Sequence, residues 1–169
     1  MKILHIALNN SITGRQMGLV RALQSLGEYR EIDWKAIKAK NGVQMLRHII
    51  QRTSNEFKPD LTFMQLQAPD IIDINTAKQL KGTVVNWTGD VRQPTPQWYY
   101  DIGKNIDLTL FTNTYDVEQL RGAGIKADFL QIGFDERLYI PEGSKGNYPE
   151  IVFLGNDYGN WFPLSQMRR

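Results

Sequence analysis

The sequence contains no cysteine among its 169 residues, which excludes a disulfide framework, a thiolate nucleophile and a cysteine-ligated metal. It also lacks any apolar run approaching the roughly 18 residues that a membrane-spanning helix needs. The short apolar segment at the N-terminus soon turns polar, which is not the pattern of a signal peptide. These absences predict a soluble, cytoplasmic chain that contacts membranes at most peripherally.

The chain also lacks a strong charge of either sign. Twenty basic and eighteen acidic residues leave a formal net charge of +2, and the basic residues are spread along the chain. Composition therefore gives no support for nucleic-acid binding. The chain has only two histidines, His5 in an expected strand and His48 on a helix flank. Neither has partners at metal-ligand spacing, so we predict structural roles for both and no metal site.

What the sequence does have is a regular alternation of β-rich runs and amphipathic segments. The expected strands cover residues 2–8, 31–37, 61–67, 83–87, 107–113 and 127–133. The expected helices cover residues 15–26, 43–52, 72–80, 97–104 and 115–121, and in the second of these Met45, Leu46, Ile49 and Ile50 are expected to face inward. Stacked βαβ units predict an α/β fold, a Rossmann-like doubly wound parallel sheet with helices on both faces.

A change in composition follows the last expected strand. The segment 139–150, YIPEGSKGNYPE, concentrates glycine, proline, serine and charge, and an apolar run, IVFLG, comes after it. We therefore expect a Rossmann-like domain over residues 1–140 and a linker over 141–150. Residues 151–169 are expected to be the truncated start of a second domain.

In doubly wound sheets, ligands bind beyond the carboxyl ends of the strands, where the strand order reverses. With the common order 3-2-1-4-5-6, the loops at 9–14 and 87–94 would line that crevice together. Five residues of the first loop are candidate substrate contacts near a helix start: Asn9, Asn10, Ser11, Thr13 and Gly14. The alternative is that these residues only cap the helix. Gln65 and Gln67 are weaker candidates, for which hydrogen bonding at an edge or turn is favoured.

The stretch NWTGDVRQP, residues 86–94, ends the fourth expected strand abruptly. Asp90 could act as a base or bind hydroxyls, Arg92 could hold phosphate or orient the acid, and Trp87 could stack on a sugar. Thr88 and Gly89 lie between them and are counted with the substrate contacts. The residues fit equally well a turn in which Asp90 caps the next helix, Arg92 is in solvent and Trp87 is in the core.

The segment GFDERLYIP, residues 133–141, resembles the one that closes the N-terminal domain of GT-B-fold glycosyltransferases, G-[VI]-D-x-x-x-[FY]-x-P. Gly133, Asp135, Tyr139 and Pro141 match that pattern. The following IVFLG resembles the first strand of the nucleotide-sugar domain in that family. Most of the chain is similar to the CgeB-like, family 4-type glycosyltransferases of bacteria and phages.

This resemblance implies the acceptor-side domain of a hexosyltransferase-type enzyme. Such an enzyme moves a sugar from a nucleotide-sugar to an acceptor, here unidentified, in an interdomain cleft, with no cofactor and no obligatory metal. The resemblance implies Asp90 as the catalytic base and places the loops 9–14 and 87–92 on the cleft. The donor would bind a missing C-terminal domain, so this part alone would be inactive. The alternative is a non-catalytic Rossmann-like ligand-binding or regulatory module.

Overall fold

The computed structural model describes residues 1–9 and 16–133, and these residues form an alternating series of strands and helices. The elements are β1 (Lys2–Ala7), α1 (Met17–Ser25), β2 (Glu28–Asp33), α2 (Trp34–Phe57), β3 (Leu61–Met64), α3 (Ile74–Gln79), β4 (Thr83–Thr88), α4 (Gln97–Gly103), β5 (Leu108–Phe111), α5 (Thr114–Gly122) and β6 (Ala127–Phe129). Four expected contacts, Asn10, Ser11, Thr13 and Gly14, lie outside the described residues, as does the segment 134–169 with the expected linker.

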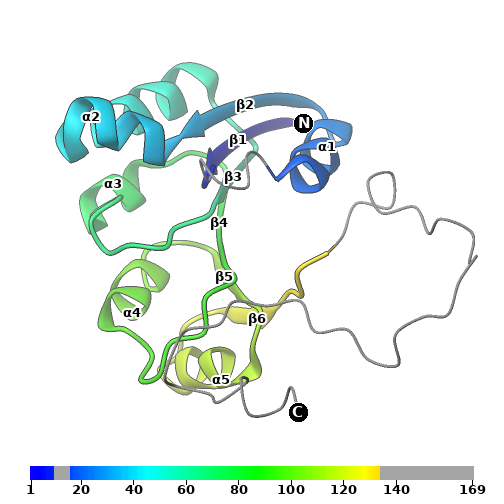
Figure 1. The fold of residues 1–169 in the computed structure, drawn as a ribbon, viewed down its shortest axis with the longest axis vertical. Coiled ribbons are helices and arrows are strands. Elements are labelled where there is room, and N and C mark those ends of the chain that lie inside the picture. The colour runs from blue at the N-terminus through cyan, green and yellow to red at the C-terminus, as the bar shows by residue number, and fades with distance from the viewer. Residues whose placement is uncertain (10–15, 134–169) are drawn as a thin grey trace, which may run out of the picture. The chain divides into compact units, whose positions relative to one another are not determined.

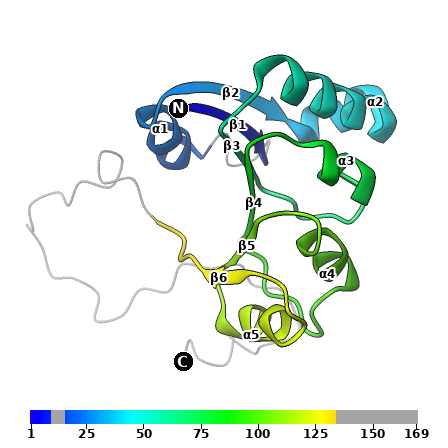
Figure 2. The ribbon, with the colours of Figure 1, turned by 180° about the vertical axis from the view of Figure 1, so that it is seen from behind.

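All six strands of the described residues are parallel and form one sheet in the order β2-β1-β3-β4-β5-β6. Helix α1 packs on one face of this sheet, and α2, α3 and α4 pack on the other (Figure 1). Helix α5 joins α4 against β5 and β6, as the reverse view also shows (Figure 2). The predicted fold, a Rossmann-like doubly wound parallel α/β sheet with helices on both faces, is confirmed.

The expected strand order is wrong at one position that matters for the site. Strand β3, rather than β4, lies beside β1, with Ile3 paired to Leu61 and Leu61 paired to Thr83. The expected strand 31–37 ends early, because Asp33 caps a helix there by accepting a hydrogen bond from the backbone N–H of Ala36 at 3.0 Å. Helix α2 then carries the chain across β1 and delivers β3 to its far side.

Helix α2 buries a narrower stripe than the sequence indicated. Leu46 and Ile50 are completely buried in the main core, and Ile49 packs against that core from its edge. Met45 is 47% exposed, so its expected inward position is wrong. The helix is bent at Gly42, whose backbone is not helical, and the part after the bend presents Leu46 and Ile50, four residues apart, to the sheet.

Candidate functional site

The topological switch point lies between β1 and β3. From β1 the chain turns to β2 on one side, and the later strands of the described residues lie on the other side. Residue Asn9, just beyond β1, and Gln65, just beyond β3, therefore flank the position where ligands of such sheets bind. The expected adjacency of β1 and β4, from which the pairing of loops 9–14 and 87–94 was inferred, is wrong, because β3 lies between these strands.

Gln65 connects three elements at this switch point. Its side chain is only 2% exposed. Its Oε1 accepts hydrogen bonds from the backbone N–H of Leu8 at 3.3 Å and from Nε2 of His5 at 3.0 Å, and its Nε2 donates to Oε1 of Gln16 at 3.0 Å. The sequence favours a turn or edge role for Gln65. The amide is instead the buried link between β1, β3 and the residue that precedes α1.

A second set of polar contacts reaches β2 from the same place. Nδ1 of His5 lies 2.8 Å from the hydroxyl of Tyr29, which donates to Glu31 at 2.5 Å. Nδ2 of Asn9 donates to Glu31 at 3.1 Å and to Asp33 at 3.2 Å. The predicted contact residue Asn9 is thus held by two carboxylates. Its amide oxygen can still accept hydrogen bonds, because both contacts use the nitrogen.

The sequence prediction missed the acidic side of this site. Tyr29, Glu31 and Asp33 alternate along β2, and the register pairs His5 with Glu31 and Ala7 with Asp33. The signal was present as the alternation in EYREID, residues 28–33. Because the strand was expected to begin at Glu31, residues 28–30 were left out of it and the period-2 pattern was not recognised.

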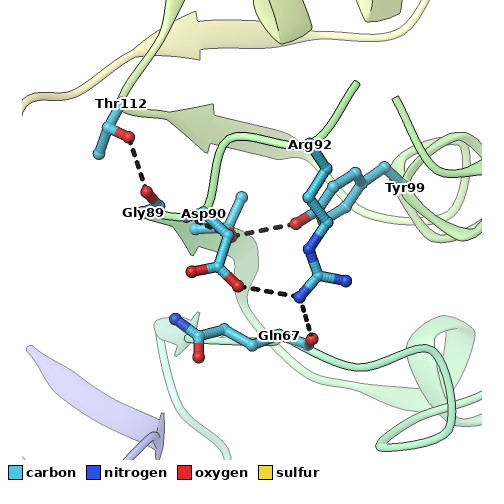
Figure 3. A network of polar contacts seen from close by, with 7 residues as sticks. Gln67, Gly89, Asp90, Arg92, Tyr99 and Thr112 are labelled. Carbon is cyan, nitrogen blue, oxygen red and sulfur yellow. Dashed lines mark hydrogen bonds and ion pairs between the residues drawn. The ribbon is translucent and has the colours of Figure 1, made fainter. Parts of the chain in front are cut away.

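Asp90 and Arg92 form an ion pair one strand further along the same edge (Figure 3). The Nη2 of Arg92 lies 2.9 Å from Oδ2 of Asp90 and donates to the carbonyl of Gln67 at 2.7 Å. The Asp90 side chain is 41% exposed and the Arg92 side chain is 35% exposed, so a molecule in solution can reach both. The alternative in which Asp90 caps the next helix and Arg92 is in solvent is wrong, because α4 begins without a side-chain cap and Arg92 makes both of these contacts. Arg92 fixes one oxygen of Asp90 and braces the loop on the end of β3.

The other predicted contacts of this stretch fall on different sides of it. Trp87 lies half-buried against the core on the α1 face, and its indole N–H donates to the carbonyl of Leu130 at 3.1 Å. Thr88 is 1% exposed, and its hydroxyl lies 3.1 Å from that of Tyr99. Gly89 accepts a hydrogen bond from the Thr112 hydroxyl at 3.1 Å (Figure 3). Asp90 and Arg92 are therefore the pair that this stretch offers to a ligand.

The buried hydroxyl below the ion pair is a neutral group. Burial raises the pKa of Tyr99 above its usual value, and the Thr88 hydroxyl opposes this only in part. The ring also packs edge-on against Phe111, with the ring centroids 5.3 Å apart. Tyr99 thus supports the start of the loop from below as a phenol, and a phenol held this way does not act as a base at neutral pH.

The loop after β3 is fastened to α2 by two ion pairs. Lys38 contacts Asp70 at 2.6 Å, and Arg47 contacts Asp73 at 2.9 Å. The hydrogen bond from Lys38 lowers the pKa of Asp70. The backbone N–H of Thr76, with Arg47 nearby, lowers the pKa of Asp73. These contacts hold in place the segment that begins with Gln65 at the switch point.

We expect Asp73→Asn to destabilise the protein at neutral pH but not in acid. Asparagine can still cap α3, so the substitution removes mainly the charge facing Arg47. A lowered folded-state pKa stabilises the fold above the unfolded value of about 3.9, and this stabilisation disappears as the pH falls through the folded value. Urea unfolding from pH 7 to pH 2.5 should therefore show the two proteins converging at low pH.

The matched control for that experiment is Asp101→Asn on α4. The Asp101 carboxylate accepts a hydrogen bond from the neutral side chain of Gln97 at 3.0 Å, with no cationic partner in that contact. Its difference from the wild type should change less with pH than that of Asp73→Asn. A constant difference for Asp73→Asn across the whole range would contradict the assignment of its effect to charge.

Other features of the described residues do not extend this site. His48 is exposed on α2, and residues 1–9 and 16–133 contain no group of His, Asp or Glu side chains that could hold a metal ion. Among residues 1–9 and 16–133, no helix combines the length and apolarity needed to cross a membrane. A shallow depression beside Asp107 and Lys126 lies at the amino-terminal ends of β5 and β6. It is at the wrong edge, since doubly wound sheets bind ligands at their carboxyl ends.

The carboxyl edge therefore presents a row of polar groups from three neighbouring strands. Asn9 follows β1, Gln67 follows β3 with the Gln65 amide buried beside it, and the Asp90–Arg92 pair follows β4. Amides, a carboxylate and a guanidinium in such a row can bind hydroxyls, and the carboxylate can accept a proton.

No family model matches this sequence, and no curated protein matches it either.

Proposed function

We propose that this chain is the acceptor-side domain of a GT-B-type glycosyltransferase, which transfers a sugar from a nucleotide-sugar to an acceptor hydroxyl. The observation that carries the proposal is the half-exposed Asp90 carboxylate at the carboxyl edge of the sheet, held in one orientation by Arg92. The resemblance at 133–141 supports it, because in the chain that segment follows the six-stranded sheet, whose strand β6 ends at Phe129. Cytoplasmic location and transfer without a metal belong to the same proposal.

In this proposal Asp90 removes the proton from the attacking hydroxyl. Its Oδ2 is occupied by Arg92, which leaves Oδ1 to accept the proton. The same Arg92 nitrogen also donates to the carbonyl of Gln67, a second contact that favours this position of the guanidinium. A fixed carboxylate needs little reorganisation in the transition state, which is the property that a positioned general base requires.

Asp90→Asn should lower nucleotide-sugar-dependent transfer by about 10²–10⁴-fold, the usual contribution of a general base. The assay uses the full-length protein and follows the release of nucleoside phosphate together with the formation of glycosylated product. Asp128→Asn is the matched control, because it removes a carboxylate from another exposed Asp–Arg pair with the same 2.9 Å contact. Equal turnover in the wild type and Asp90→Asn would remove Asp90 from the mechanism.

A second candidate function is a ligand-binding or regulatory module without catalysis. It is favoured by the contacts of the ion pair, since Arg92 already occupies one oxygen of the Asp90 carboxylate and ties the loop to the end of β3. Amide chemical shifts of the chain titrated with sugars distinguish the candidates when combined with the assay. Shifts at Asn9, Gln65 and Arg92 without any transfer by the full-length protein would favour the module.

A further inference from the structure

His5 is a buried imidazole with a hydrogen-bonding atom facing each of its ring nitrogens. Its side chain is 1% exposed, in the middle of β1. Nε2 lies 3.0 Å from Oε1 of Gln65, and Nδ1 lies 2.8 Å from the Tyr29 hydroxyl. Each of these two contacts therefore constrains whether the ring nitrogen that makes it carries a proton.

The contact to Gln65 requires a proton on Nε2. The backbone N–H of Leu8 points at the same amide atom of Gln65 at 3.3 Å. A backbone N–H can only donate, so the atom that faces it must be the amide oxygen and not the amide nitrogen. An oxygen in that position can only accept from His5, and Nε2 is therefore protonated.

The contact to Tyr29 requires a proton on Nδ1 as well. The single hydroxyl proton of Tyr29 is donated to Glu31, at 2.5 Å. The phenol oxygen then has only acceptor capacity left for His5. We propose that His5 carries protons on both ring nitrogens, that its charge is balanced by Glu31 through Tyr29, and that this triad positions the amides of Gln65 and Asn9 at the switch point.

The energetics of burial support a balanced triad rather than an isolated cation. A buried charge is tolerated when it is paired and hydrogen-bonded. Glu31 is only half-buried and accepts from both Asn9 and Tyr29, and two donors favour the ionised form of a carboxylate. The reverse arrangement, with neutral His5 and protonated Glu31, places the proton on the group with the lower reference pKa, about 4.3 against about 6.5.

The triad determines what the switch point offers to a ligand. Because the imidazolium donates to Oε1 of Gln65, the amide nitrogen is directed to Gln16. Because Glu31 is ionised, it accepts from Nδ2 of Asn9, which leaves the Asn9 oxygen as that side chain's acceptor. The triad is a positioning device on this account, and the inference does not depend on which reaction the protein performs.

The experiment is nitrogen NMR of the imidazole side chains in the 169-residue chain, labelled with ¹⁵N. Only two histidines are present, and exposed His48 serves as an internal reference that is assigned with His48→Gln. At pH 7.5 the wild type should show both nitrogens of His5 at imidazolium shifts. In Glu31→Gln, Nδ1 should move to the shift of an unprotonated nitrogen, since the introduced amide can donate to the Tyr29 hydroxyl, which then donates to Nδ1.

Two further variants keep the result decisive. Glu28→Gln removes the same charge from an exposed position on the same strand and should leave His5 unchanged. Tyr29→Phe removes the bridging hydroxyl and should also abolish the imidazolium signal. This variant provides the test if Glu31→Gln folds poorly. An unprotonated Nδ1 in the wild type would overturn the proposal. So would imidazolium shifts that persist in both Glu31→Gln and Tyr29→Phe.

Discussion

Gly82→Ala should destabilise the protein by roughly 2–5 kcal/mol, the sum of a left-handed backbone penalty of about 1–2 and an overpacking cost of about 1–3. Gly82 has a φ of +74°, and a Cβ there would lie 2.4 Å from the carbonyl oxygen of Pro59 and 2.5 Å from that of Asp60. These are backbone atoms, so no side-chain rotation can relieve the contact. The free energy of unfolding in urea measures the loss.

Gly124→Ala separates the two parts of that effect. Gly124 has nearly the same φ, +73°, but a Cβ there meets no atom within 4 Å. It should therefore cost only the backbone penalty of about 1–2 kcal/mol. The difference between the two variants reports how closely the segment before β4 approaches the segment before β3. Equal losses would show that this approach is looser than 2.4 Å implies.

Leu46→Ala should cost about 2–5 kcal/mol, because it removes a completely buried side chain from the core between α2 and the sheet. Its neighbour Met45 is 47% exposed, so Met45→Ala should change the free energy of unfolding by no more than about 0.5 kcal/mol. The two variants differ by one position on the same helix. They test the rotation of α2 about its axis and not merely its existence.

A large decrease in the free energy of unfolding of Met45→Ala would instead support the original expectation that this side chain faces inward. Both variants are measured by urea unfolding at the same pH, with helix content checked by circular dichroism. Alanine has the highest helix propensity, so neither substitution weakens α2 itself. Any loss therefore reports packing against the sheet.

The fold was largely predictable because parallel strands buried on both faces are continuous apolar runs, and KILHIAL and TVVNW are such runs. The alternation with helices then left few topologies. The strand order was not predictable in the same way. It depends on the side of β1 to which α2 returns the chain, which no pattern within one segment specifies. The start of α2 was also missed, because the cap at Asp33 is a local hydrogen bond that competes with strand formation at residues 34–37.

The candidate site was predicted in part. The stretch 87–92 was identified from its abrupt change of residue type, and the structure places Asp90 and Arg92 together at the carboxyl edge. The network around Gln65 was missed, because His5 and Gln65 are 60 positions apart in the sequence. Only the pairing of β1 with β3 brings them into contact. Periodicity within one segment carries no information about such pairings.

The contact between Arg92 and residue 67 has a consequence for how this protein can change. Arg92 is braced by the main-chain carbonyl of Gln67, not by its side chain (Figure 3). Every amino acid supplies that carbonyl, so the identity of residue 67 can vary while the Asp90–Arg92 geometry is retained. Residue 67 lies beside the pair and is half-exposed. It is therefore a position where the side chain beside the pair can be varied, by natural variation or by a focused library, while the Asp90–Arg92 geometry is left intact.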